Sequence, residues 1–180
     1  MIGKLFALGA AAPYRHAEIW AREATSGPDR LRIGGGLRPV AVIQDLATLL
    51  AGPVYVLVVL NVPRCGGNPG RYESDALTQA EVATFLAEFE SLFTNDARAE
   101  LWIGSTSGEG LLVLDEHDLI YAYGPLDAFS ARLSARGYGH GLPRAPDPHE
   151  HHYNEELDDL QARLIARDWR RVLPLDDDAE

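Results

Sequence analysis

Three of the chain's six histidines lie within four positions of one another, as His149, His151 and His152. Imidazole is a common ligand for zinc and related ions, and it also exchanges protons near neutral pH. On an extended segment His149 and His151 would share a face, whereas on a helix His149 and His152 would do so. Either pair would supply two ligands, so the cluster is a candidate metal site with zinc as the possible ion.

A complete site needs a third ligand from elsewhere in the chain. His117 with Asp118, in a short polar turn, or His140, in a glycine-flanked loop, could provide it. The alternative is that the cluster only precedes a helix that begins at Asn154, where polar and acidic residues gather to cap the first turn. The spacing His149-Glu150-His151 does not match the H-E-x-x-H pattern of zinc proteases.

Cys65 is the chain's single cysteine and lies in the glycine-rich segment 64–71. One cysteine permits no intramolecular disulfide and no cysteine-based structural zinc site, which fits a reducing cytoplasm. The neighbouring Arg64 and Arg71 could activate the thiol as a nucleophile, but a lone cysteine is more often a small apolar side chain. The glycine clusters also lack the spacing and the lysine of nucleotide-binding loops.

The charge balance narrows the choice of partners. The chain has 27 acidic residues against 16 basic ones, a formal net charge of -11. Such a field repels nucleic acids and anionic membranes and attracts basic proteins. No stretch of about 18 apolar residues occurs, so the sequence predicts no membrane span. Lys4 is the only lysine and alanine is abundant, which is typical of a GC-rich bacterial genome.

Several elements can be predicted from local patterns. The valine-rich run Val54 to Leu60 is typical of a central strand that is buried on both faces. Thr78 and Glu81 have the spacing of a capping box, and apolar residues at helical intervals follow them. Three antiparallel strands in a meander are expected over Arg98 to Ser105, Leu111 to Leu114 and Leu119 to Tyr123.

The remaining expectations complete an α+β domain. We expect one domain over residues 1–180, with a mainly antiparallel sheet of four to five strands packed against two or three helices and an acidic, solvated tail at 176–180. The further elements are helices over His16 to Thr25, over Pro39 to Ala51, after Pro125 and after Asn154, a turn-rich connector over Ser26 to Gly36, and an edge strand over Trp169 to Leu175.

Two groups of residues in the meander are candidates for partner binding. Hairpin turns project from a rigid sheet, so the acids of the two turns could enter a cleft in a basic protein. Tyrosines two positions apart share one face of a strand, and tyrosine suits interfaces that are half apolar and half wet. The candidates are Glu109, Asp115, Glu116, Asp118, Tyr121 and Tyr123.

No catalytic set is complete in the sequence, whereas an acidic surface and a compact frame suffice for a binding protein. In size, charge and lack of catalytic motifs the chain resembles the immunity proteins of interbacterial toxin systems. That resemblance implies a cytoplasmic inhibitor that covers the active site of a cognate, often basic, toxin domain and needs no cofactor. The alternative is a metal-dependent enzyme centred on His149, His151 and His152.

Overall fold

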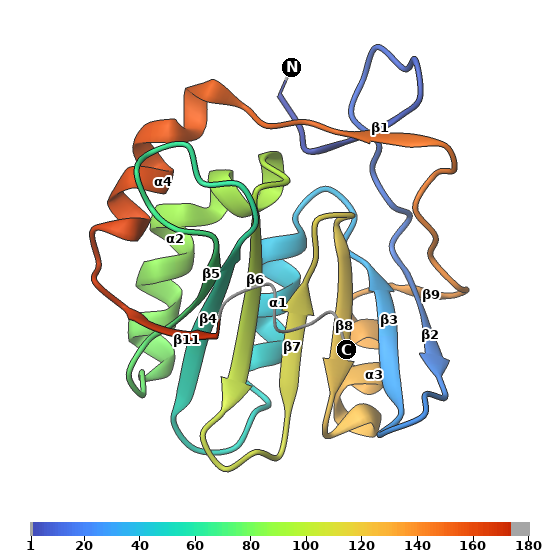
Figure 1. Cartoon of the computed structure of the whole chain (residues 1–180). Helices are drawn as coiled ribbons and strands as arrows, with labels where there is room; N and C mark the ends of the chain where they lie inside the picture. The colour runs from blue at the N-terminus through green and yellow to red at the C-terminus, as the bar shows by residue number, and fades with distance from the viewer. Residues whose placement is uncertain (1, 174–180) are drawn as a thin grey trace.

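The computed structural model describes residues 2–173, and within them the chain forms a nine-stranded mixed sheet, a two-stranded sheet and four α-helices (Figure 1). The predicted sheet of four to five mainly antiparallel strands was therefore wrong. The large sheet has the order β11-β5-β4-β6-β7-β8-β3-β2-β9, and all its pairings are antiparallel except β2 with β9. The acidic residues 176–180 lie outside the described residues.

The elements follow one another along the chain in an irregular alternation of strands and helices. They are β1 (Leu5–Ala7), β2 (Ile19–Glu23), β3 (Arg30–Gly34), α1 (Pro39–Ala47), β4 (Val54–Leu60), β5 (Gly70–Glu73), α2 (Gln79–Asn95), β6 (Ala99–Ser105), β7 (Leu111–Leu114), β8 (Leu119–Tyr123), α3 (Leu126–Ala135), β9 (Gly139–His140), β10 (His149–His151), a 3-10 turn at Glu155–Leu157, α4 (Asp158–Ile165) and β11 (Arg170–Leu173).

The local predictions in the middle of the chain are confirmed. Thr78 caps α2 with both hydrogen bonds of the capping box, which satisfies backbone N–H groups that the first turn leaves unpaired. β4 lies between β5 and β6, with most of its side chains buried, as the valine-rich run predicted. The three meander strands appear as β6, β7 and β8 in that order.

The N-terminal predictions need correction. Residues 16–25, expected to be helical, contain β2, and the connector over 26–36 contains β3. β3 has the sequence Arg30-Leu31-Arg32-Ile33, an alternation of polar and apolar residues that indicates a strand with one buried face. With β5 and β9, these strands widen the sheet beyond the expected size, because each has a partner far away in sequence.

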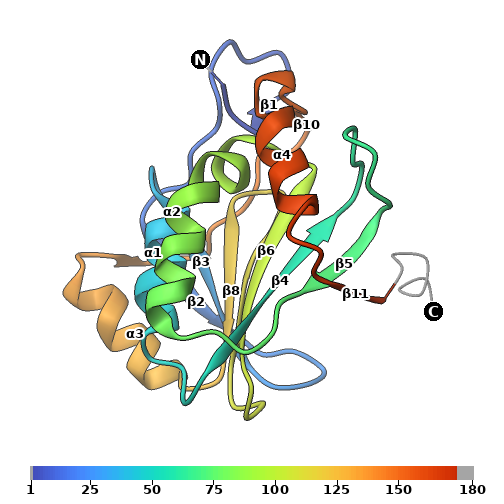
Figure 2. The ribbon, with the colours of Figure 1, turned by 90° about the vertical axis from the view of Figure 1, so that its left-hand side faces the viewer.

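The helices pack on one face of the large sheet. Figures 1 and 2 show α1, α2 and α3 on the same side of the strands, and the core between them is built from apolar side chains of both layers. Within residues 2–173, no helix covers the opposite face. The strands at the two ends of the sheet, β5 with β11 and the β2–β3 hairpin, curve towards that face (Figure 2). No described helix is long and apolar enough to cross a membrane.

The two-stranded sheet lies across one end of the large sheet (Figure 1). β1 pairs with β10, so Leu5 lies opposite His151 and Ala7 opposite His149. The fully buried ammonium of Lys4 anchors this ribbon, because it contacts Asp118 at 3.2 Å and donates hydrogen bonds to the carbonyls of Phe93 and Asp115. The pairing thereby places β10 next to the turn between β7 and β8.

Candidate functional site

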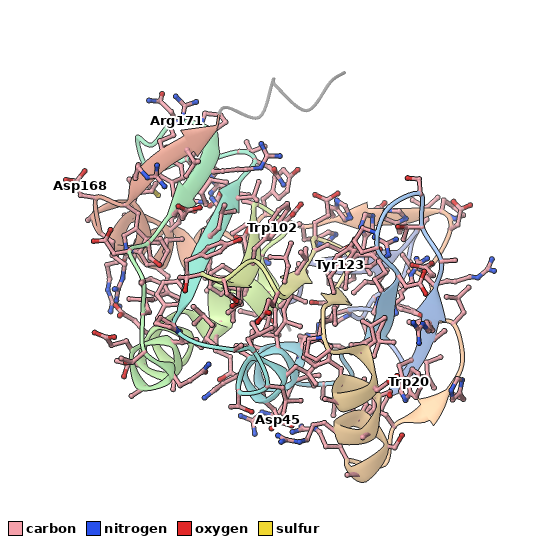
Figure 3. All side chains as sticks on the ribbon, turned by 90° about the horizontal axis from the view of Figure 1, so that it is seen from below. Trp20, Asp45, Trp102, Tyr123, Asp168 and Arg171 are labelled. Carbon is pink, nitrogen blue, oxygen red and sulfur yellow. The ribbon has the colours of Figure 1, made fainter. Side chains whose placement is uncertain are left out.

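The helix-free face of the large sheet carries a groove of about 790 Å³. Side chains that alternate with the buried ones point out of this face, and Figure 3 shows Trp102 and Tyr123 on the side opposite the helices, with Trp20 on the helix side. The groove crosses β3, β4, β6, β7 and β8. Its larger lining side chains are Arg30, Tyr55, Glu100, Trp102, Tyr121 and Tyr123.

Arg30 is held between the two tyrosines predicted to form a binding face. Its guanidinium lies 4.1 Å from the centre of the Tyr121 ring and donates a 2.8 Å hydrogen bond to the Tyr123 hydroxyl. Glu23 accepts a second hydrogen bond from Arg30, at 2.8 Å. Burial raises the pKa of Tyr121. This part of the groove is therefore a fixed array of aromatic faces and one cation.

Glu100 is a groove carboxylate whose pKa is raised by its surroundings. It lies on β6 two positions from Trp102, whose indole N–H donates a 3.2 Å hydrogen bond to it. Burial raises the pKa of Glu100 and the nearby carboxylates of Glu116 and Asp115 raise it further, against the opposing effect of the Trp102 hydrogen bond. A partly buried carboxylate of this kind gains from a cation that reaches it.

The four acids predicted for partner binding do not form one patch. Glu109 and Asp115 line the groove, but the first lies in the β6–β7 turn and the second just after β7, at the other end of that strand. Asp118 has a side chain only 4% exposed, paired with Lys4 and Arg15. Glu116 accepts a hydrogen bond from Asn61. Asp118 therefore holds the structure together instead of facing a partner.

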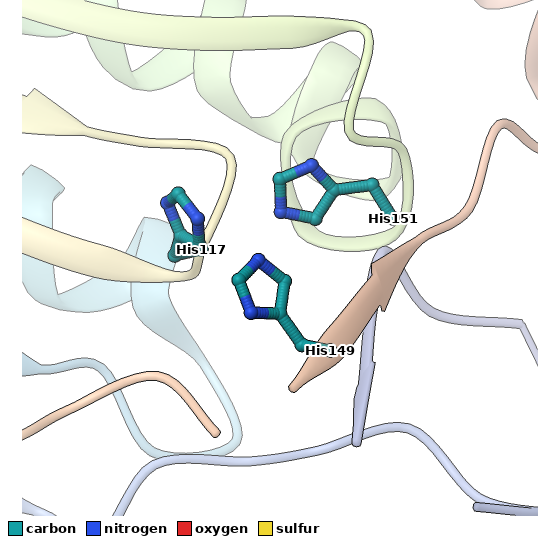
Figure 4. Close-up of side chains that lie close together, drawn as sticks. All are labelled: His117, His149 and His151. Carbon is teal, nitrogen blue, oxygen red and sulfur yellow. The ribbon is translucent and has the colours of Figure 1, made fainter. Parts of the chain in front are cut away.

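A second cluster lies at the β7–β8 turn, where His117 meets His149 and His151 (Figure 4). Their candidate ligand nitrogens all lie within 4.8 Å of one another, and each residue is partly exposed. The ring centres are 4.7 Å to 5.0 Å apart. β10 is extended, so His149 and His151 share a face, as one of the two alternatives expected.

The turn that carries His117 is tightly fixed. The Asp115 carboxylate accepts hydrogen bonds from the backbone N–H groups of His117 and Leu119, both at 2.9 Å. Its other oxygen lies 3.3 Å from Nδ1 of His117, and this contact raises the pKa of His117. His16 donates from Nε2 to the His117 carbonyl at 2.7 Å, since a carbonyl can only accept.

The other candidate ligands lie outside this cluster. His152 stacks on Phe6 with ring centres 4.1 Å apart, and its Nε2 is 3.7 Å from Glu150. His140 lies on the edge strand β9 and contacts the Trp20 ring. The structure therefore brings together two of the three histidines predicted as a metal site, and it adds His117, one of the third ligands considered.

Cys65 lies away from both sites. Its thiol donates to the Asp158 carbonyl at 3.1 Å, and the side chain is partly buried beside α4. Arg64 is held by ion pairs with Asp158 and Glu155, at 3.1 Å and 3.2 Å. The thiol contacts that the structure shows are those of a packed side chain.

Arg30, Tyr55 and Glu100 are groove residues that were not singled out from the sequence. Alternation could have found Arg30, because β3 alternates arginine with apolar residues. Glu100 and Trp102 are two positions apart on β6, and side chains at this spacing lie on the same face of a strand. An outward Trp102 therefore implies an outward Glu100. Comparison of the chain with family models, with curated proteins and with solved structures found no match.

Proposed function

We propose that this chain works by binding a basic protein at the helix-free face of its large sheet. The observation that carries the proposal is the groove over β3 to β8, lined by Trp102, Tyr121, Tyr123 and Arg30. Tryptophan, tyrosine and arginine are the residues that dominate binding energy in protein interfaces. On a sheet they are presented by a rigid backbone.

The groove is ordered before any partner arrives. Arg30 is fixed by Glu23 and by the Tyr123 hydroxyl, and it stacks on Tyr121. Immobilising a long side chain on binding costs about 0.5–1.5 kcal/mol. Because these contacts already restrict Arg30, little of that cost remains, and the part of Arg30 that lines the groove can act as a ready anchor.

Charge complementarity favours a basic partner. The formal net charge of -11 attracts cations at long range, and Glu100 offers a carboxylate within the groove at short range. An arginine or lysine from the partner would extend along the aromatic side chains and end at Glu100. Its alkyl stem would bury apolar surface while its charge meets the carboxylate.

The finer proposal is that the partner is a toxin domain that this chain neutralises. A basic domain covered by an acidic, preformed surface loses access to its active site, which is how an immunity protein acts. The net charge and the groove support this assignment, and its test measures binding and protection separately.

The experiment co-expresses the chain with the product of the gene adjacent to its own and measures growth and complex formation. We expect the adjacent product to be toxic alone and harmless with the chain. Replacing both tyrosines, Tyr121→Ser with Tyr123→Ser, should weaken the complex by at least about 30-fold, since two interface anchors contribute about 1 kcal/mol or more each. Glu100→Gln should weaken it by about 10-fold.

The matched control is Asp159→Asn, which removes one negative charge from an exposed position on α4 and should leave binding unchanged. A complex of unaltered affinity in the Tyr121/Tyr123 and Glu100 variants would refute the groove as the binding site. An adjacent product that is harmless alone, with no complex at low ionic strength, would refute the toxin assignment.

A further inference from the structure

Three imidazole rings meet at one end of the molecule, although they come from two segments about thirty residues apart. His117 comes from the β7–β8 turn, and His149 and His151 from β10 (Figure 4). Each neutral imidazole has one nitrogen with a lone pair, so the cluster brings several candidate ligand nitrogens together. A bound cation is the usual way in which proteins satisfy such a group.

The hydrogen bonds of two rings select the nitrogen that remains for a ligand. Nδ1 of His149 lies 2.8 Å from the Pro146 carbonyl, which can only accept, so Nδ1 carries the proton and Nε2 keeps its lone pair. The Asp115 carboxylate orients His117 in the same way, through Nδ1. Carboxylates and carbonyls on the far nitrogen are the usual second shell of metal-binding histidines.

A second observation points independently to a ligand. Nε2 of His151 is buried and has no hydrogen-bond partner among the described residues. A buried polar atom left unsatisfied costs about 1–3 kcal/mol, which a bound ion would remove. In Figure 4 the rings of His149 and His151 turn a nitrogen towards each other, with His117 beside them.

We propose that His117, His149 and His151 bind one divalent transition-metal ion of the zinc class through Nε2. Zinc–nitrogen bonds of about 2.0–2.1 Å in a tetrahedral site place ligand nitrogens about 3.3 Å apart. The nitrogens here lie within 4.8 Å, so the rings close by at most about 1.5 Å around the ion. Imidazole ligands select zinc, copper, nickel or iron over magnesium and calcium, which prefer oxygen.

The three ligands leave one tetrahedral position for a small molecule. Each histidine is partly exposed, and no fourth cysteine, histidine or carboxylate joins the group among residues 2–173. Structural zinc sites carry four protein ligands, whereas sites with three keep an exchangeable water. The ligand that we assign to this position is therefore water, replaceable by a small anion.

None of the three proposed ligand histidines lines the groove, so each proposal can fail alone. The test titrates zinc, and separately cobalt(II), into tag-free, chelator-treated full-length protein. We expect one ion per chain with a Kd at or below about 1 μM, and the visible spectrum of four-coordinate cobalt. Azide should shift that spectrum by displacing the water.

Single variants then locate the site. His117→Gln, His149→Gln and His151→Gln should each lower zinc affinity by at least about 100-fold, and Asp115→Asn, which keeps the Oδ1 acceptor of the turn, by about 10-fold to 100-fold. His152→Ala is the matched control from the same segment and should bind zinc like the wild type. Far-ultraviolet circular dichroism of the metal-free variants checks that each is folded.

X-ray absorption at the zinc edge supplies a measurement that needs no variant, and it should show three imidazole ligands. Two results overturn the proposal: wild-type protein that binds no zinc at 100 μM, or folded variants at positions 117, 149 and 151 that bind as tightly as the His152→Ala control.

Discussion

Arg98 is fully buried, and replacing it by methionine tests how the end of the large sheet is held to the C-terminal helix. Its guanidinium binds the buried Asp96 carboxylate through two hydrogen bonds of 2.9 Å and 2.6 Å. It also donates to Asp158 at 2.7 Å and to the Asn154 carbonyl at 3.0 Å. Arg98→Met therefore leaves the Asp96 carboxylate buried without its cation.

Removing one partner of a buried ion pair costs about 3–5 kcal/mol, so the free energy of unfolding should fall by that amount. For a chain of this length the melting temperature should fall by roughly 6–20 °C. Urea unfolding followed by circular dichroism gives the free energy. The matched control is Arg170→Met, because Arg170 is 72% exposed in its pair with Glu73 and should change stability by less than about 1 kcal/mol.

Adding Asp96→Asn to Arg98→Met removes the unpaired charge and should restore at least about 1 kcal/mol relative to the sum of the single changes. A loss below about 1 kcal/mol in Arg98→Met, or strict additivity in the double variant, would refute the assignment of a coupled buried network.

Two further predictions concern the groove and its neighbours. Gly124→Ala should lower the free energy of unfolding, measured in urea, more than Gly137→Ala does. Both residues have positive φ angles, but of the two only Gly124 would place the added Cβ against backbone, 2.6 Å from the Glu109 carbonyl oxygen. Equal losses in the two variants would contradict this. Burial alone would raise the pKa of Glu23, but hydrogen bonds from Arg30 and Arg32 outweigh it and lower the pKa below its usual 4.5. Folding therefore favours the ionised form of Glu23. The difference in the free energy of unfolding between wild type and Glu23→Gln should be at its full size above pH 4.5 and should disappear as the pH falls through the lowered pKa. A difference that persists unchanged at pH 2 would exclude this linkage.

Local patterns predicted the middle of the chain because the residues that define each element lie close together there. Thr78 and Glu81 cap α2 across three positions, and the valine run of β4 is one continuous signal. β2 and β10 are short strands that each pair with a segment more than a hundred positions away, namely β9 and β1, so tertiary pairing contributes to their conformation. Short strands of this kind are the ones that sequence patterns missed.

Some features of the candidate sites also follow from local patterns, whereas others depend on contacts between distant parts of the chain. The shared face of Tyr121 and Tyr123 follows from strand geometry, and both tyrosines line the groove. The structural role of Asp118 could not be read from its neighbours, because Lys4 and Arg15 reach it from more than a hundred positions away. The meeting of His117 with His149 and His151 likewise depends on β1 pairing with β10.

The pairing of β1 with β10 also sets the order in which the protein can be completed during its synthesis. Leu5 leaves the ribosome well before His151, the residue opposite it in the two-stranded sheet. At about 5–20 residues per second, that interval lasts on the order of 10 s. β1 therefore waits without its partner while the central strands form, which exposes its apolar side chains to chaperones. The histidine cluster is assembled only when β1 and β10 have paired.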